Sequence, residues 1–373
     1  MPIAWASVLS GRRGKGENAV PAGSVAARVI GPAPGAPAEG GTSEGTAVGA
    51  GAPALGKDTA PVLVVTDLVK RFGDKVAVDH VSFEVTPGET FGLLGPNGAG
   101  KTTTLAIIAG LLRPDGGDVW VGGHSLRTSR ARAQRLLGVV PQEVALYPDL
   151  TALQNMRYFA TLRGLRGRER DVQIEEALEL VGLREHARER VDRFSGGMKR
   201  RLNIAVGLLG RPRLLLLDEP TVGIDPQSRR HILDAVKDLA AAGMTVLYTS
   251  HYMEEVEYLC RRVAIMDHGR VIAQGSLEEV RRLAGEAVVL RVRVSGIETP
   301  PDWSRLAREA GCPLEVADGE LRVVLPDGPR QAPGILSLLT AHGIPLDGLR
   351  LEAPNLETVF LSLTGRGLRD EEV

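Results

Sequence analysis

The sequence is short of cysteine, of long apolar runs and of net charge, and each shortage excludes a class of protein. The two cysteines, Cys260 and Cys312, do not have the spacing of a metal pair and are too few for a disulfide framework. We predict that both are buried thiols in a reducing compartment. No stretch reaches the roughly 18 apolar residues of a membrane-spanning helix. The net charge of −1 gives no general attraction to nucleic acid, so no nucleic-acid partner is expected.

Signals for export are missing as well. The start, MPIAWASVLSGRRGKGE, places a short apolar run before its charges, whereas a secretory signal has the opposite order. Arg12-Arg13 is not followed by an apolar segment, so a twin-arginine signal is not expected either. We therefore expect a protein that stays in the cytoplasm.

Composition divides the 373 residues into three parts. Residues 1–58 are rich in Gly, Ala, Pro and Ser with few large apolar side chains, so we predict a disordered extension; a misassigned translation start is the alternative. Residues 59–285 alternate apolar strands with helical stretches, which predicts an α/β fold with a parallel sheet. Residues 286–373 are predicted to form a small α+β domain, because VVLRVRV (288–294) and LRVVLP (321–326) alternate as half-exposed strands do.

The pattern of apolar residues assigns the elements of the central part. Residues 150–190 are rich in helix formers, with apolar residues at three- and four-residue spacing, so a helical subdomain is expected at about 143–200. A turn at Gly73-Asp74 separates the first two predicted strands. The predicted strands are VLVV (62–65), VSFEV (81–85), FGLLG (91–95), LLLLD (214–218), VLYTS (246–250) and RVAIM (262–266).

A phosphate-binding loop follows the strand at 91–95 and precedes the helical stretch TTTLAIIAGLL. It fits the pattern G-x-x-x-x-G-K-[ST] and comprises Gly95, Pro96, Asn97, Gly98, Ala99, Gly100, Lys101, Thr102 and Thr103. The glycines let backbone N–H groups face phosphate oxygens, and the helix N-terminus adds partial positive charge. Lys101 is predicted to reach the β- and γ-phosphates, and the Thr102 hydroxyl to bind Mg²⁺. A glycine-rich turn without a ligand is the alternative, and the strand and helix on its two sides argue against it.

Two carboxylates at the end of LLLLD complete the chemistry that such a loop needs. Asp218 is predicted to finish the magnesium site, because the end of a neighbouring strand faces the loop. Glu219 follows directly and is predicted to orient or deprotonate the attacking water. Alone, the pair is also compatible with a capped strand end. Together with the loop it indicates hydrolysis of a nucleotide.

A second turn of the same kind lies within RFSGGMKRRLNIAVGLL (193–209). Ser195 offers a hydroxyl donor, and Gly196 and Gly197 permit a close backbone approach to an anion. The residues that follow have helical spacing, so another helix N-terminus would point at a phosphate. An isolated SGG is usually an ordinary loop, and its meaning depends on the motifs around it.

The motifs GPNGAGKT, Gln142, FSGGM, LLLLDEP, GIDP and His251, in this order, resemble those of the ATP-binding subunit of an ABC transporter. The resemblance covers roughly residues 62–285 and implies a P-loop NTPase core that binds ATP and Mg²⁺ and hydrolyses ATP. It also implies a head-to-tail dimer, homodimeric or heterodimeric, with two ATP molecules at its interface. In that dimer FSGGM of one subunit caps the γ-phosphate that the other subunit holds, which explains two turns in one chain.

The resemblance assigns roles to four further residues. Gln142 resembles the Q-loop glutamine, which touches the metal or water and reports to a transmembrane partner. Asp225 resembles the D-loop aspartate that crosses the dimer interface. His251 resembles the switch histidine that hydrogen-bonds to the γ-phosphate, and Phe72 resembles the aromatic residue that stacks on adenine. Each also has an ordinary explanation, such as a polar loop residue for Gln142, a surface histidine for His251 and a core aromatic for Phe72.

Other stretches indicate which kind of ABC protein this is. Met198 and Phe194 stand where the family most often has Gln and Leu; neither faces phosphate, so they point to a subfamily. LTALQNMRYFATLRGL (150–165) resembles the helical subdomain of exporter ATPases whose permease is a separate chain. PNLETVFLSLTG (354–365) resembles the C-terminal signature of the daunorubicin-resistance type of ABC-2 exporter ATPase. Leu356, Val359, Phe360 and Leu363 share one face of that predicted helix, which would pack on its own domain or help dimerisation.

The resemblance therefore implies an ATPase at the cytoplasmic face of the membrane that energises a separate permease. Drug or antibiotic export is the leading hypothesis, and lipid or polysaccharide export is the alternative. A soluble ABC ATPase acting on ribosomes usually has two ATPase cassettes in one chain, whereas this chain has one P-loop and one FSGGM motif. A DNA-repair ATPase would carry a coiled coil or zinc cysteines between the motifs, and a simple P-loop kinase would lack FSGGM and His251.

Overall fold

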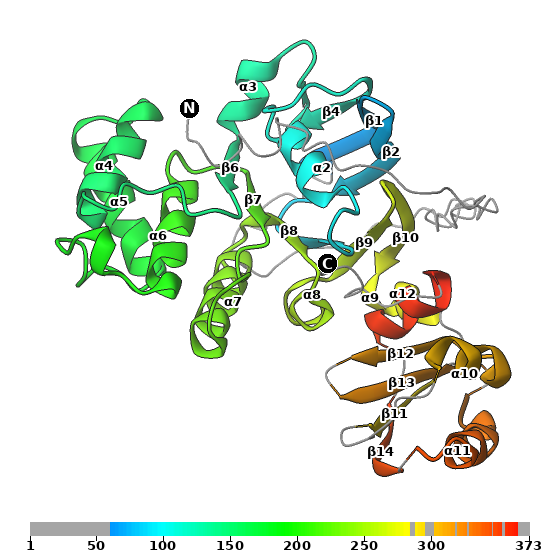
Figure 1. Cartoon of the computed structure of the whole chain (residues 1–373). Coiled ribbons are helices and arrows are strands. Elements are labelled where there is room, and N and C mark those ends of the chain that lie inside the picture. The colour runs from blue at the N-terminus through cyan, green and yellow to red at the C-terminus, as the bar shows by residue number, and fades with distance from the viewer. Residues whose placement is uncertain are drawn as a thin grey trace, which may run out of the picture.

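The computed structural model (Figure 1) describes residues 60–283, 288–294, 302–317, 319–326, 328–344, 346–352 and 355–364. The extension predicted at 1–58 lies outside these residues. Residues 284–287, which include the predicted boundary between the second and third parts, lie outside them too. The division into domains at these positions stays a prediction.

A six-stranded sheet in the order β10-β9-β3-β8-β7-β6 forms the centre of the fold. Its strands are β3 (Thr90–Leu94), β6 (Leu137–Val140), β7 (Leu214–Asp218), β8 (Thr245–Ser250), β9 (Arg262–Asp267) and β10 (Arg270–Ser276). All neighbours are parallel except β10, which runs antiparallel to β9. Every residue of β3, β7 and β8 is buried, as their continuous apolar runs predict. The loops after these three strands therefore leave the sheet at one edge.

The first two predicted strands belong to a second, antiparallel sheet in the order β2-β1-β4-β5. Its strands are β1 (Leu63–Phe72), β2 (Lys75–Val85), β4 (Gly116–Val121) and β5 (His124–Ser125). The turn between β1 and β2 contains Gly73 with a φ of +58°, a conformation that glycine adopts without strain. The rings of Phe83 and Phe91 stack with centroids 5.3 Å apart, and one core cluster joins this sheet to the central one. The sequence pattern predicts these strands but not their separate sheet.

Helices cover the central sheet and form a lobe at one side of it. The helices of the core are α2 (Lys101–Ile108), α3 (Arg130–Arg135), α7 (Pro226–Ala241), α8 (Met253–Leu259) and α9 (Leu277–Arg282). The lobe contains α4 (Ala152–Leu162), α5 (Gly167–Leu180), the short helix η2 (Val191–Arg193) and α6 (Gly196–Leu208). Figure 1 shows α4, α5 and α6 together, away from β1 and β2. The helical subdomain predicted at about 143–200 overlaps these helices, and α6 extends beyond it to Leu208.

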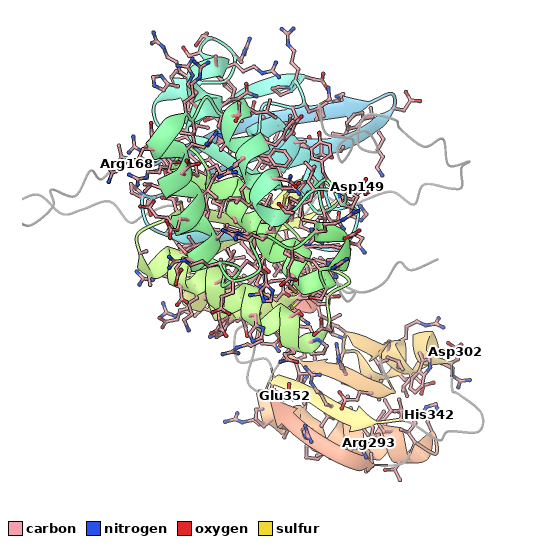
Figure 2. The ribbon with its side chains drawn as sticks, turned by 90° about the vertical axis from the view of Figure 1, so that its left-hand side faces the viewer. Asp149, Arg168, Arg293, Asp302, His342 and Glu352 are labelled. Carbon is pink, nitrogen blue, oxygen red and sulfur yellow. The ribbon has the colours of Figure 1, made fainter. Side chains whose placement is uncertain are left out.

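The C-terminal part is an antiparallel sheet in the order β12-β13-β11-β14 with its own helices. Its elements are β11 (Val288–Arg293), α10 (Trp303–Ala310), β12 (Leu314–Ala317), β13 (Glu320–Leu325), η3 (Gly328–Gln331), α11 (Ala332–Ala341), β14 (Asp347–Glu352) and α12 (Leu356–Thr364). In Figure 2 its labelled residues Arg293, Asp302, His342 and Glu352 lie apart from Arg168 of the helical lobe and from Asp149, which precedes α4. The α+β architecture is the predicted one.

Strand β13 corrects one prediction. LRVVLP is expected to be half exposed, but all five residues of the strand from 321 to 325 are buried. Val323 packs in the cluster that contains α10 and α11, whereas Val324 joins the core cluster that contains α12. Arg322, two residues before Val324 and so on the same face of the strand, forms an ion pair with Glu357 of α12. Both faces of β13 are covered, so alternation in sequence does not mean exposure here.

Helix α12 connects the C-terminal part with the core. Leu356, Val359 and Phe360 are fully buried and belong to the same apolar cluster as Val256 of α8 and Val280 of α9. Figure 1 shows α12 between α9 and the C-terminal sheet. The apolar face predicted for this helix thus packs within its own chain.

Both cysteines are buried, as the sequence predicts. Within the described residues, no helix combines the length and the apolar character needed to cross a bilayer.

Candidate nucleotide site

The phosphate-binding loop runs from the end of β3 to the start of α2, as the sequence predicts. Gly98 and Gly100 have φ values of +80° and +102°, which favour glycine. A Cβ atom on Gly95 would lie 2.3 Å from the carbonyl oxygen of Met266, so no larger residue fits there. The Lys101 Nζ donates to the carbonyls of Gly95 at 2.7 Å and Pro96 at 3.0 Å. These contacts fold the lysine back over the loop.

The three residues predicted to be catalytic meet at the carboxylate of Glu219. Its carboxylate lies 3.0 Å from Lys101 Nζ and 3.3 Å from His251 Nδ1. Glu219 and Lys101 are only 5% and 4% exposed, so water screens their attraction poorly. Burial raises the pKa of Glu219, but the neighbouring His251 and Lys101 outweigh it and lower that pKa to about 2. The carboxylate is therefore ionised and able to accept a proton or a hydrogen bond.

Asp218 has the surroundings of a metal ligand. Its Oδ1 accepts from Thr249 Oγ1 at 2.8 Å and lies 3.3 Å from Thr102 Oγ1, while its buried Oδ2 has no hydrogen-bond partner. Burial raises the pKa of Asp218 to about 6, with Glu219 adding to the rise and the Thr249 bond opposing it. An orphaned carboxylate oxygen beside a threonine hydroxyl is a hard-oxygen set that fits Mg²⁺. Among the described residues, no group of three His, Cys, Asp or Glu side chains is placed to hold a metal ion.

A cavity of about 450 Å³ extends over the phosphate-binding loop. Its lining includes Phe72 at the end of β1 and Gln142 after β6, together with Asn97, Thr103 and Glu219. Two residues predicted from motif order alone, far from the loop in sequence, are thus brought to it. Phe72 is partly exposed and its ring also contacts Lys70 Nζ, 5.5 Å from the centroid.

The second turn lies at the start of another helix, and Ser195, Gly196 and Gly197 do not line that cavity. Ser195 caps α6, its Oγ accepting from the Met198 amide at 3.2 Å, and it is exposed. Asp225 caps α7 in the same way, accepting from the Ser228 amide at 2.9 Å.

The second turn and the start of α7 pack against each other. A Cβ atom on Gly197 would lie 2.3 Å from Ser228 Oγ and 2.4 Å from its Cβ. These two helix N-termini therefore form one surface, separate from the first loop.

Sequence reasoning missed Thr249 and Glu255. Thr249 Oγ1 holds Asp218 and accepts from the Glu219 amide at 2.9 Å, so it fixes both carboxylate residues. Glu255 is 1% exposed and binds four side chains behind His251. In the sequence, the three hydroxyl side chains at the end of VLYTS, just before His251, were the signal that could have pointed to Thr249 and to a buried acceptor such as Glu255.

Known proteins are similar to this chain over most of its length. Residues 78–222 match the family model described as "ABC transporter". The linearmycin resistance ATP-binding protein of Bacillus subtilis is 45% identical over 83% of this chain and all of its own length. A Nod factor export ATP-binding protein I of Ralstonia nicotianae is 40% identical over 85% of this chain and 98% of its own. A daunorubicin resistance ATP-binding protein of Streptomyces coeruleorubidus is 36% identical over 84% and 99%.

Solved structures show the same fold. The ATP-binding subunit of an ABC transporter has a TM-score of 0.55 and 31% identity, covering 60% of this chain and 93% of its own. An ATP-binding cassette solved as a dimer in a post-hydrolysis state, bound to ADP and Pi, has a TM-score of 0.52 and 27% identity over 58% and 98%.

Proposed function

Since this chain belongs to the family of ABC transporter ATP-binding proteins, we propose that its two phosphate-binding turns act on two different ATP molecules. The chain is the ATP-hydrolysing subunit of an exporter. In the proposed dimer, Lys101 of one subunit and Ser195 of the other grip one ATP, and the reciprocal pair grips the second.

The single observation that carries this proposal is the meeting of Lys101, Glu219 and His251 at one phosphate-binding loop. At distances of 3.0 and 3.3 Å from Glu219, the Lys101 ammonium and the His251 imidazole lie around one carboxylate. The second turn lies elsewhere on the same chain, so it is available to a neighbouring subunit's nucleotide. A head-to-tail dimer uses both turns of each chain, the first on the chain's own ATP and the second on the ATP of the neighbouring subunit.

The residues have separate tasks in hydrolysis. When ATP binds, Lys101 leaves Glu219 and contacts the β- and γ-phosphate oxygens instead. The Glu219 carboxylate is then free to contact the attacking water. Glu219 then orients that water and accepts its proton as the water oxygen attacks the γ-phosphorus; the bond from this phosphorus to the β–γ bridging oxygen breaks, and ADP leaves with that oxygen. His251, released from Glu219, donates to a γ-phosphate oxygen. Because the chemistry of phosphoryl transfer needs chiefly placement and charge stabilisation, these contacts account for most of the proposed catalysis.

Mg²⁺ would be held by Thr102 and Asp218, with Gln142 at the edge of the site. When bound it supplies charge stabilisation to the phosphate oxygens. Asp218 is kept in place for this by Thr249, and Gln142 lies where it can respond to the occupied site.

The permease is proposed to dock at an apolar cleft of about 340 Å³ beside Gln142. The cleft lies between the end of α2, β6 and the helical lobe, and its lining includes Leu111, Val139, Phe159 and Leu162. Leu111 and Leu162 are 41% and 67% exposed, and together with the other apolar side chains of the cleft they form the kind of patch that marks a protein–protein contact. An apolar helix of the permease that binds here would transmit the ATP-driven closure of the ATPase dimer to the permease, at the cytoplasmic face of the membrane.

The exported substrate is proposed to be a drug or an antibiotic. Support comes from relatives named for linearmycin resistance and daunorubicin resistance. The alternative is export of a lipid or a polysaccharide, since other relatives are named for Nod factor export and not for drug resistance.

Mixed subunits test the shared sites. Lys101→Ala subunits and Ser195→Arg subunits are each expected to be inactive alone. Mixed in equal amounts, they are expected to regain part of the activity, because one pairing leaves a site with intact Lys101 and Ser195. ATP hydrolysis is measured across mixing ratios, with each variant mixed with itself as the control. No recovery at any ratio, with dimers present by light scattering, would contradict the proposal.

A further inference from the structure

Glu255, on α8, is a buried carboxylate that accepts four hydrogen bonds. Its Oε1 accepts from Thr221 Oγ1 at 2.6 Å and from Arg229 Nε at 2.7 Å. Its Oε2 accepts from Tyr248 Oη at 2.9 Å and from Ser250 Oγ at 2.7 Å. With 1% exposure, the charge is compensated by these four donors and only one of them, Arg229, is a cation.

The four donors come from segments that carry proposed site residues. Thr221 lies two residues after Glu219, and Ser250 directly precedes His251. Arg229 lies in the first turns of α7, which Asp225 caps.

The hydroxyl of Ser250 also continues the chain of contacts toward His251. It donates to Glu255 and accepts from the Tyr252 amide at 2.9 Å, so the residues on both sides of His251 are fixed. The Tyr252 ring lies against the His251 ring with centroids 4.1 Å apart, and Arg229 lies over Tyr252 at 4.3 Å. Glu255 thus holds Arg229, which in turn supports the ring that packs on His251.

We propose that Glu255 is a positioning residue for ATP hydrolysis, which sets His251, Glu219 and the Asp225 turn at one mutual geometry. A carboxylate suits this task because it accepts from four donors at once, whereas an amide accepts at one oxygen only. The proposal rests on the roles proposed above for Glu219 and His251. Glu255 acts through other residues and does not touch the reacting atoms.

The test compares Glu255→Gln with Glu254→Gln, its exposed neighbour on α8. Glu255→Gln is expected to lower kcat by roughly 10- to 100-fold, because a misplacement of the reacting groups by about 1 Å can cost up to about 100-fold. The KM for ATP and the affinity for a trinitrophenyl derivative of ATP are expected to change less than about threefold, because the loop that binds phosphate is intact. Glu254→Gln is expected to match the parent chain.

A merely structural role would give another result. It would lower the thermal midpoint and the fraction of chains that bind the nucleotide, and kcat per binding site would stay unchanged; that outcome would overturn the proposal. If Glu255→Gln does not fold, Tyr248→Phe and Ser250→Ala, which each remove one donor, are expected to lower kcat at unchanged KM. Unchanged kcat in both would overturn it as well.

Glu219→Gln and His251→Ala, measured in parallel, separate this proposal from the site assignment. If these two variants hydrolyse ATP normally, the proposed site is wrong. If they are inactive and Glu255→Gln is normal, only the positioning role is wrong.

Discussion

Two adjacent carboxylates, Asp218 and Glu219, have opposite electrostatic surroundings. Asp218 is buried beside a like charge, which raises its pKa to about 6. Glu219 is also buried, but Lys101 and His251 lower its pKa to about 2. One side chain is thus prepared to receive a cation and the other is already neutralised by one. The sequence DE alone contains no sign of this difference.

The raised pKa of Asp218 predicts a pH dependence of stability in protein free of Mg²⁺ and nucleotide. The folded protein holds a proton at Asp218 more tightly than the unfolded chain, whose pKa is 3.8. Stability from this group is therefore fully present below about pH 4 and is lost as the pH rises through about 6. Relative to Asp218→Asn, the thermal midpoint of the parent chain is expected to fall across this interval.

Asp225→Asn is the control for that experiment. Backbone hydrogen bonding by Ser228 lowers the pKa of Asp225 from its ordinary value of 3.8. The stability that the ionised Asp225 carboxylate contributes is therefore lost only as the pH falls below 3.8. The difference between this variant and the parent is expected to be flat between about pH 4 and 6. Parallel profiles for the parent and Asp218→Asn would contradict the assignment of the shift to Asp218.

At the scale of elements, the starts of α2, α6 and α7 carry predicted site residues. Gly100 precedes α2, Ser195 caps α6 and Asp225 caps α7, so all three helices begin at predicted site residues. The starts of α6 and α7 also pack tightly, with Gly197 against Ser228. Gly197 of the FSGGM turn is therefore needed for helix packing in addition to any phosphate contact.

Gly197→Ala is expected to destabilise the protein by about 1–3 kcal/mol, because its Cβ would overlap the Ser228 side chain. Gly196→Ala is the matched control, since its Cβ would meet only Ile224 Cδ1 at an ordinary 3.5 Å. Chemical denaturation of both variants measures the difference. Adding Ser228→Gly to Gly197→Ala is expected to restore part of the loss, and equal stability of the two alanine variants would refute this explanation.

At the scale of the whole molecule, the chain has a covered apolar surface and an exposed one. The apolar face of α12 is covered, because Phe360 and its neighbours pack in the core cluster shared with α8 and α9. The apolar cleft near Gln142 keeps Leu111 and Leu162 exposed. Of these two surfaces, only the cleft is open to a permease.

Leu162→Glu is therefore expected to remove the permease from the complex. The tagged parent chain, purified from native membranes in mild detergent, is expected to bring a multi-span membrane protein in stoichiometric amount. The variant is expected to lose that protein and to keep its own ATP hydrolysis, because the cleft does not touch the phosphate-binding loop. Leu180→Glu, also on the helical lobe and 40% exposed, is the control and is expected to keep the permease. Recovery of ribosomes or only soluble chains by the parent would overturn the transport assignment.

The local sequence by itself determined the loop from Gly95 to Thr103, the strand that ends at Asp218 and the helix start at Ser195. Each of these is a contiguous stretch whose geometry follows from glycine freedom, apolar runs and capping side chains, so neighbours in sequence suffice. Motif order also predicted that Phe72 and Gln142 belong with the loop, and both line its cavity. Their chemical roles stay predictions.

Only the tertiary structure decided which distant groups meet. The parallel pairing of β7 with β8 places Thr249 beside Asp218, and the burial behind that edge gathers four donors on Glu255. The coverage of β13 by α12 was likewise decided by packing, because alternation fixes only which side chains share a face. Burial and through-space charge depend on every element that surrounds a residue, and no single stretch of sequence contains that information.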